Sequence, residues 1–89
     1  MNVVEDWQVV LSVSEHDDET QAEARLVMSG SAGLSGRGKA RCNPTDQNVT
    51  KIGEEIAVAR ALSDLAEGLL HVATTDVEAV THQRARLHM

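Results

Sequence analysis

The sequence has few aromatic residues, and this shortage limits the core that it can build. Among 89 residues there is one Trp, at position 7, and there is no Phe or Tyr. The core must therefore consist of Val, Leu, Ile, Met and Ala. A chain of this length forms one domain and buries roughly 60–65% of the surface of its unfolded form. We expect a single domain over residues 1–89 with a thin core, which burial between subunits would stabilise.

Other absences exclude whole classes of protein. A single cysteine, Cys42, cannot form an internal disulfide. The net charge of −6 disfavours non-specific binding to nucleic acid or to an anionic membrane, because both need clustered cations. No apolar run approaches the ~20 residues of a membrane span. The short acidic start, MNVVEDW, does not resemble a signal peptide, so a cytoplasmic location is expected.

Motifs for catalysis and for metal binding are also missing. The sequence contains no GxSxG, HExxH, P-loop or GxGxxG pattern. The acidic turn around Asp17 and Asp18 lacks the alternating ligands and the distal Glu of a calcium loop. The four histidines do not have the spacing of zinc ligands, and Cys42 has no second cysteine. We therefore expect no enzymatic activity, no cofactor and no metal site.

The first half of the chain alternates in a way that is typical of strands. In residues 7–15 the apolar side chains of Trp7, Val9, Leu11 and Val13 share one face. After the acidic turn, residues 20–28 alternate again. The inward positions of this second strand are Ala22, Ala24, Leu26 and Met28.

A third, weaker strand is predicted over residues 34–42, and it ends before Pro44. Its inward positions are occupied by Leu34, Gly36, Gly38, Ala40 and Cys42. These small residues would suit a helix whose backbone passes close above them. Alternatively, Gly38 marks a bulge that shifts the register beyond it.

The second half of the chain predicts a long amphipathic helix over residues 49–72. Gly53, Arg60, Asp64, Glu67 and His71 are expected to face away from the sheet. The opposite, sheet-facing side is predicted to contain Ile52, Ile56, Val58, Ala59, Leu62, Leu65, Ala66, Leu69 and Leu70.

The capping-box pattern Thr75-x-x-Glu78 predicts a short second helix over residues 76–81, followed by a polar tail. The predicted fold class is therefore α+β, with element order β-β-β-α-α. A three-stranded antiparallel sheet would be covered by the long helix, with the short helix at the end.

A row of cations is the most conspicuous surface feature. Arg37, Lys39 and Arg41 point to one side of the third strand, and Arg25 joins them from the second. This row could bind phosphates or an acidic partner. Alternatively, these cations pair with Glu23 across the strands and protect a sheet edge from aggregation.

Three segments together resemble a family of small bacterial proteins that is known only as a domain of unknown function. They are EHDDETQAEARLVMSG, IGEEIAVARALSDLAEGLL and TTDVEAVTH. The resemblance covers nearly the whole chain and implies a fold like that of the double-stranded-RNA-binding domain without its first helix. It implies no activity. The tail departs from the family pattern, with Arg84 where a Pro is expected.

The function that these observations favour is a non-enzymatic, cytoplasmic interaction domain that forms homo-oligomers, with an unidentified protein as a further partner. It would associate through an open sheet edge or through the exposed sheet face. One alternative is a nucleic-acid accessory module that uses Arg25, Arg37, Lys39 and Arg41. The RNA-binding analogy is weakened by Glu54 and Glu55, which stand where that domain presents lysines. The other alternative is a small-ligand binder with a pocket beside Trp7.

Overall fold

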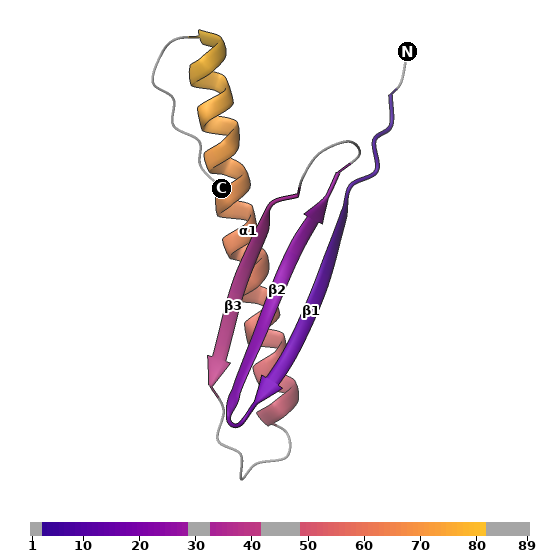
Figure 1. The fold of residues 1–89 in the computed structure, drawn as a ribbon, viewed down its shortest axis with the longest axis vertical. Helices are drawn as coiled ribbons and strands as arrows, with labels where there is room; N and C mark the ends of the chain where they lie inside the picture. Colours follow the sequence, from indigo (N-terminus) through magenta and orange to yellow (C-terminus); the bar gives the residue numbers. More distant parts are fainter. Residues whose placement is uncertain (1–2, 29–32, 42–48, 82–89) are drawn as a thin grey trace.

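The described part of the protein contains three strands and one helix. The computed structural model describes residues 3–28, 33–41 and 49–81. The elements are β1 (Gln8–His16), β2 (Glu19–Val27), β3 (Ser35–Arg41) and α1 (Val49–Thr81). The strands form an antiparallel meander in the order β1-β2-β3, and α1 lies along one face of it (Figure 1). The predicted α+β class and strand order are confirmed, with strand bounds shifted by one residue. Cys42 and the predicted tail 82–89 lie outside the described residues.

The β1–β2 hairpin turns at Asp17 and Asp18, as predicted. Asp17 has a φ of 57°, in the left-handed region that Asp tolerates better than most residues. The register of the hairpin is continuous from His16 opposite Glu19 to Gln8 opposite Val27. The acidic turn is therefore an exposed hairpin tip.

The core lies between α1 and the strands β2 and β3, and most of its residues are small. The inward positions predicted for β2 and β3 are confirmed, and Met28 and Leu34 are half-buried at its margin. The β2–β3 register continues through Gly38 without an extra residue, so the bulge alternative is wrong. The buried apolar residues are Ala22, Ala24, Leu26, Ala40, Ala57, Ala61 and Leu65.

The glycines of β3 allow the helix to approach closely. A Cβ atom at Gly36 would collide with the backbone of Ala61 and Leu65. At Gly38 it would collide with the backbone of Ala57 and Ala61. The prediction that the helix backbone passes close above these glycines is confirmed.

The predicted sheet-facing side of the helix is wrong in its centre. The buried stripe consists of Gly53, Ala57, Ala61 and Leu65, and Gly53 had been assigned to the opposite side. Ile52 and Ile56 are exposed instead. The reason is steric, because the small side chains of Ala57 and Ala61 fit where the helix backbone rests on a glycine-containing strand.

The helix also runs further than predicted. The predicted second helix over residues 76–81 is part of α1, which continues without a break to Thr81. The hydroxyl of Thr75 donates a hydrogen bond to the His71 carbonyl, at 3.1 Å, and Thr74 donates to Leu70 in the same way, at 2.9 Å. These threonines satisfy carbonyls of the preceding turn rather than capping a new helix. At 33 residues α1 is about 50 Å long, against about 30 Å for a nine-residue strand, so it extends past the sheet (Figure 1).

The prediction that β1 is half-buried is also wrong. The helix packs on β3 and β2 and barely touches β1. Val9 and Leu11 lie directly opposite the buried Leu26 and Ala24, so their side chains point to the helix side. Every residue of β1 is nevertheless exposed, and Val9 and Leu11 are 43% and 45% exposed. The helix therefore covers two strands of the sheet and leaves the third uncovered.

Candidate interaction surfaces

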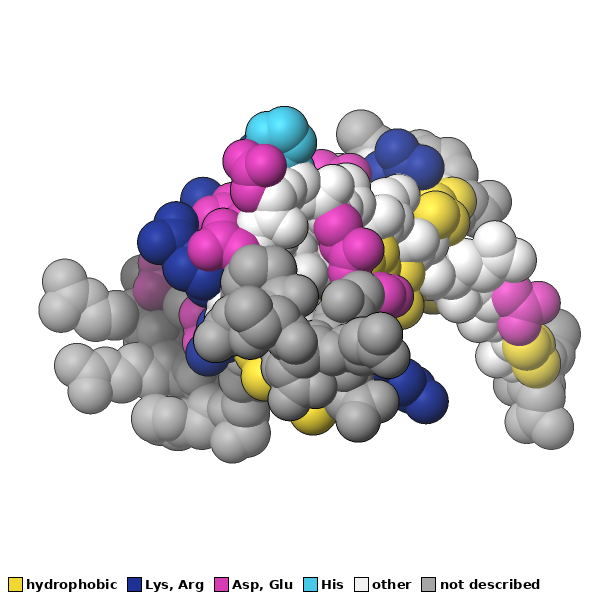
Figure 2. Space-filling view, turned by 90° about the horizontal axis from the view of Figure 1, so that it is seen from below, with side chains coloured by type: hydrophobic (Ala, Val, Ile, Leu, Met, Phe, Trp, Pro, Cys, Tyr) yellow, Lys and Arg dark blue, Asp and Glu magenta, His cyan; other side chains and the backbone are white. Residues whose placement is uncertain are grey.

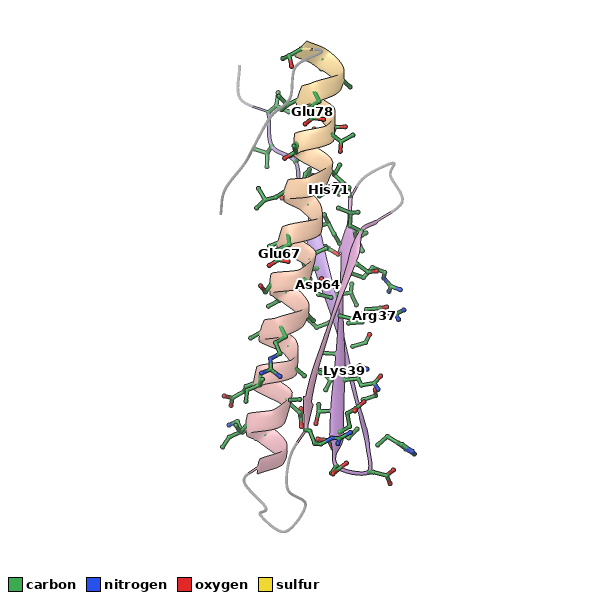
Figure 3. The ribbon with its side chains drawn as sticks, turned by 90° about the vertical axis from the view of Figure 1, so that its left-hand side faces the viewer. Arg37, Lys39, Asp64, Glu67, His71 and Glu78 are labelled. Atoms are coloured by element: carbon green, nitrogen blue, oxygen red, sulfur yellow. The ribbon has the colours of Figure 1, made fainter. Side chains whose placement is uncertain are left out.

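The four predicted basic residues lie together on the face of the sheet that points away from α1. Figure 3 shows the side chains of Arg37 and Lys39 pointing away from the helix. Arg37 lies directly opposite Glu23, with its Nε 3.5 Å from a Glu23 carboxylate oxygen. Arg25 lies opposite Ser35. On this face, cations of β3 therefore lie across from carboxylates of β2.

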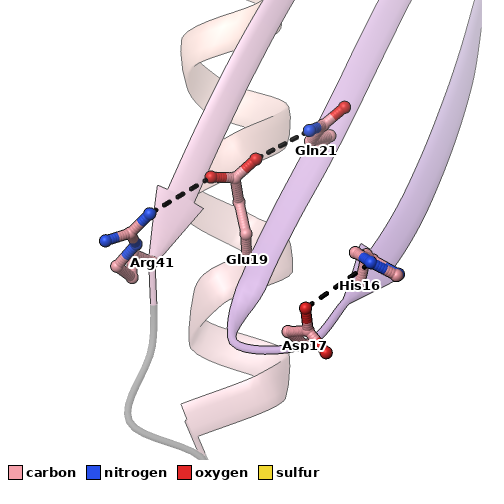
Figure 4. Close-up of polar contacts among 5 residues, drawn as sticks. All are labelled: His16, Asp17, Glu19, Gln21 and Arg41. Carbon is pink, nitrogen blue, oxygen red and sulfur yellow. Dashed lines mark hydrogen bonds and ion pairs between the residues drawn. The ribbon is translucent and has the colours of Figure 1, made fainter.

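Glu19 is the second carboxylate among these cations (Figure 4). Its carboxylate accepts a hydrogen bond from the Gln21 amide at 2.7 Å and lies 3.7 Å from the Arg41 guanidinium. The bond from Gln21, followed by the charges of Lys39 and Arg41, lowers the pKa of Glu19 below its usual range. The basic row is thus partly neutralised by its own sheet, which agrees with cross-strand pairing.

The outer edge of β3 is closed by two polar side chains of α1. The backbone N–H of Arg37 donates a hydrogen bond to the Asp64 carboxylate, at 2.9 Å. The guanidinium of Arg60 donates to the Lys39 carbonyl, at 2.7 Å. Figure 3 shows Asp64 on the side of α1 that borders β3. Sequence reasoning placed Arg60 and Asp64 in solvent. Their four-residue spacing, which puts both on one helix face, was the available signal.

The outer edge of β1 has a different character. Arg37 N–H points outward from β3, so Glu23 opposite it turns its backbone groups towards β1. Ser12 lies opposite Glu23, so its backbone N–H and C=O groups point towards β2. The direction alternates along a strand, so the backbone groups of Leu11 and Val13 point away from the sheet. Within the part of the chain that the structure describes, no side chain closes this edge.

Large apolar side chains are exposed on β1 and on α1. We call the inward-pointing residues Val9, Leu11 and Val13, together with Trp7 just before β1, the β1 row. They are 41–51% exposed. On the helix, Val58, Ala59 and Leu62 line an open hollow of about 450 Å³ together with three charged residues, Lys51, Glu54 and Glu55. Figure 2 shows hydrophobic side chains at the surface in separate patches, several of them beside charged side chains. Trp7 itself borders a hollow formed by residues 4–7, in the segment before β1.

The described residues contain no group of His, Cys, Asp and Glu side chains arranged to hold a metal ion. The nearest approach is at the hairpin, where His16 lies 3.5 Å from Asp17 and both side chains are almost fully exposed. No helix among the described residues is long and apolar enough to span a membrane.

The chain matches one protein family over nearly its whole length. The model of the Rv2632c-like family matches residues 5–86. The chain belongs to the Rv2632c-like family. The expected resemblance to a small bacterial family is thereby confirmed, while the comparisons give no name to the fold.

Relatives in mycobacteria support this assignment. The chain is 52% identical to the uncharacterized protein MT1780 of Mycobacterium tuberculosis (strain CDC 1551 / Oshkosh) over 86 residues, which are 97% of this chain and 90% of the relative. It is 47% identical to the uncharacterized protein Rv2632c of M. tuberculosis (strain ATCC 25618 / H37Rv) over 76 residues, covering 85% and 81%. The crystal structure of Rv2632c superposes with a TM-score of 0.81 at 45% identity, over 92% of this chain and 96% of that one.

Proposed function

We propose that this protein is a non-enzymatic, cytoplasmic interaction domain that self-associates through its apolar surface. This surface combines the β1 row with the side of α1 that faces away from the sheet. The observation that supports it most is the exposure of large apolar residues there, while no large side chain among the described residues is fully buried. Exposed apolar patches of several hundred Å² are typical of association sites.

The distribution of charge supports the same surface. The ion pairs Arg37–Glu23 and Arg41–Glu19 lie on the opposite face of the sheet, and Asp64 and Arg60 lie at the β3 edge. Between Val9 and Ser14 the first strand has no charged side chain. An acidic chain meets least repulsion from its own copy at an uncharged surface, so the β1 part of the apolar surface suits self-association.

Nucleic-acid binding through Arg25, Arg37, Lys39 and Arg41 is the less favoured proposal. Phosphate binding depends on cations that are not already neutralised. Glu23 and Glu19 interrupt the row and pair with two of its members. The likeness to the double-stranded-RNA-binding fold therefore supports a shared architecture and no shared activity.

The proposal is tested with two substitutions that add the same charge to opposite sides of the molecule. Leu62→Lys changes the apolar surface, whereas Val10→Lys changes the outer face of β1. Leu62 and Val10 are equally exposed, at 40% and 39%, which makes them matched controls. We expect light scattering across a concentration series to show an oligomer for the wild type and for Val10→Lys.

For Leu62→Lys we expect association at least about tenfold weaker, because a buried ammonium is costly at an apolar interface. Circular dichroism checks that both variants stay folded. A wild-type chain that is monomeric at every concentration would rule out self-association. Equal weakening by both substitutions would instead place the interface outside the apolar surface.

A further inference from the structure

The side of α1 opposite the sheet contains a second apolar stripe, which we call the outer seam. Its positions recur at alternating intervals of four and three residues, the heptad spacing of a helix that packs along another helix. The buried stripe on the sheet side has a uniform interval of four. The outer seam consists of Ile52, Ile56, Ala59, Ser63, Ala66, Leu70, Ala73, Val77 and Val80.

The outer seam is accessible and has no partner among the described residues of the sheet. Ile52 and Ile56 are 51% and 39% exposed near its start, and Val80 is 80% exposed at its end. Ala59 and Ser63 are exposed in its first half, and Ala66 and Leu70 follow as half-buried positions. The seam also continues along the part of α1 that extends past the sheet (Figure 1). Packing on its own sheet therefore does not account for it.

We propose that α1 pairs in parallel with α1 of a second copy along the outer seam. This inference rests on the proposed self-association and specifies its geometry. The heptad interval requires a partner that is itself a long helix, and the chain has one such element of its own. Small side chains at Ala59, Ser63 and Ala66 let two helix backbones approach closely in the middle of the seam. Each copy keeps its sheet on the far side of its helix.

Charges beside the seam decide the orientation. Glu55 and Arg60 lie on the two sides of the outer seam. In a parallel pair, Glu55 of each copy lies near Arg60 of the other, so the two-fold symmetry gives two such pairs. The Arg60 guanidinium bonds the Lys39 carbonyl through one nitrogen and has further donors for a carboxylate.

An antiparallel pair would give less favourable electrostatics. In the register that sets Glu55 beside Asp76 of the other copy, like charges meet on one side of the seam, while Glu67 lies beside Arg60 on the other side. The repulsion offsets the attraction, in a chain that already carries a net charge of −6. The parallel arrangement is therefore the one that the sequence of α1 favours.

Disulfide trapping tests this geometry on the full-length chain. Cys42 is first replaced by Ser, so that a single new cysteine reports on each position. Ser63→Cys and Ala66→Cys lie on the seam, and each faces its own copy in a parallel pair at a distance that a disulfide can bridge. Thr75→Cys lies on the same helix away from the seam and serves as the control. We expect mild oxidation to link most of the first two variants and little of the third.

The outcomes separate this inference from the proposed function. Linkage at position 66 without linkage at 63 would indicate antiparallel helices and overturn the proposal. An oligomer by light scattering with no linkage at either position would overturn parallel helix pairing but leave self-association standing. A monomeric Cys42→Ser chain would contradict both. Light scattering on each reduced variant, at the concentration used for oxidation, provides the reference.

Discussion

The two sides of the sheet are constructed in opposite ways. On the β3 side, glycine and alanine let α1 rest directly on the strand, and Asp64 and Arg60 satisfy backbone groups of its edge. On the β1 side, valine and leucine point towards the helix layer but barely contact the helix, and no side chain of the described residues protects the edge. Small residues thus produce the closed side of the molecule, and large residues form the open one.

One steric cause explains both sides. Because Gly36 and Gly38 have no side chains, the helix can pack directly on β3. This packing brings Asp64 and Arg60 within hydrogen-bonding distance of the strand. A helix at the same height above β1 would clash with Val9 and Leu11. The helix therefore sits to one side, and a domain that buries few large side chains leaves several others for a partner.

The largest effect is expected from Gly38→Ala. The new methyl group would collide with the backbone of Ala57 and Ala61, so the helix must shift away from β3. We expect the free energy of unfolding to fall by about 3 kcal/mol, at the upper end of the usual cost of overpacking. Urea unfolding followed by circular dichroism measures it.

Val13→Ala on the open side is the matched comparison for Gly38→Ala. Val13 is 41% exposed and contacts little of α1, so its truncation should cost less than about 1 kcal/mol. Similar losses for the two variants would show that the helix does not rest more tightly on β3 than on β1. The comparison should be made at a protein concentration where both variants are monomeric, because association adds to apparent stability.

A smaller effect is expected from Asp64→Ala, which removes the carboxylate that accepts the Arg37 N–H. The loss of an exposed hydrogen bond to a charged group should lower the free energy of unfolding by about 1 kcal/mol. The amide proton of Arg37 should also exchange faster with solvent, as hydrogen-exchange NMR would show.

Glu67→Ala is the control for Asp64→Ala, because Glu67 is an exposed carboxylate one turn further along the same side of α1. We expect it to leave the Arg37 amide unchanged. Unchanged exchange at Arg37 in both variants would mean that the β3 edge is not closed by Asp64, and that the two edges of the sheet differ less than the geometry indicates.

Periodicity in the sequence predicted the strands well and the contact between helix and sheet poorly. Alternation located β1, β2 and β3, and the pair Gly36 and Gly38 correctly predicted close helix packing. The sheet-facing stripe was missed because large apolar residues were assumed to be the buried ones. Here steric fit to the glycines outweighed size, so Ala57 and Ala61 are buried and Ile52 is exposed.

One further wrong prediction and one open alternative have local causes. The threonine at position 75 matches a capping pattern, yet its hydroxyl bonds the carbonyl of His71 and the helix continues. The row Arg25, Arg37, Lys39 and Arg41 was correctly placed on one face, but the sequence could not decide between a binding role and cross-strand pairing. That choice depends on register, since Glu23 and Glu19 must lie directly opposite Arg37 and Arg41.

The smallest expected effect is a dependence of stability on pH that comes from Glu19, on the β3 side of the sheet. Its pKa is lowered in the folded protein by the Gln21 hydrogen bond and by the charges of Lys39 and Arg41. Its contribution is therefore fully present above the unfolded pKa of about 4.3 and is lost as the pH falls through the lower folded pKa. Glu19→Gln should flatten the fall in urea midpoint between pH 5 and pH 3, relative to the wild type. Glu15→Gln, which makes the same change of net charge on β1, should flatten it less, and equal slopes for both variants would contradict a special role for Glu19.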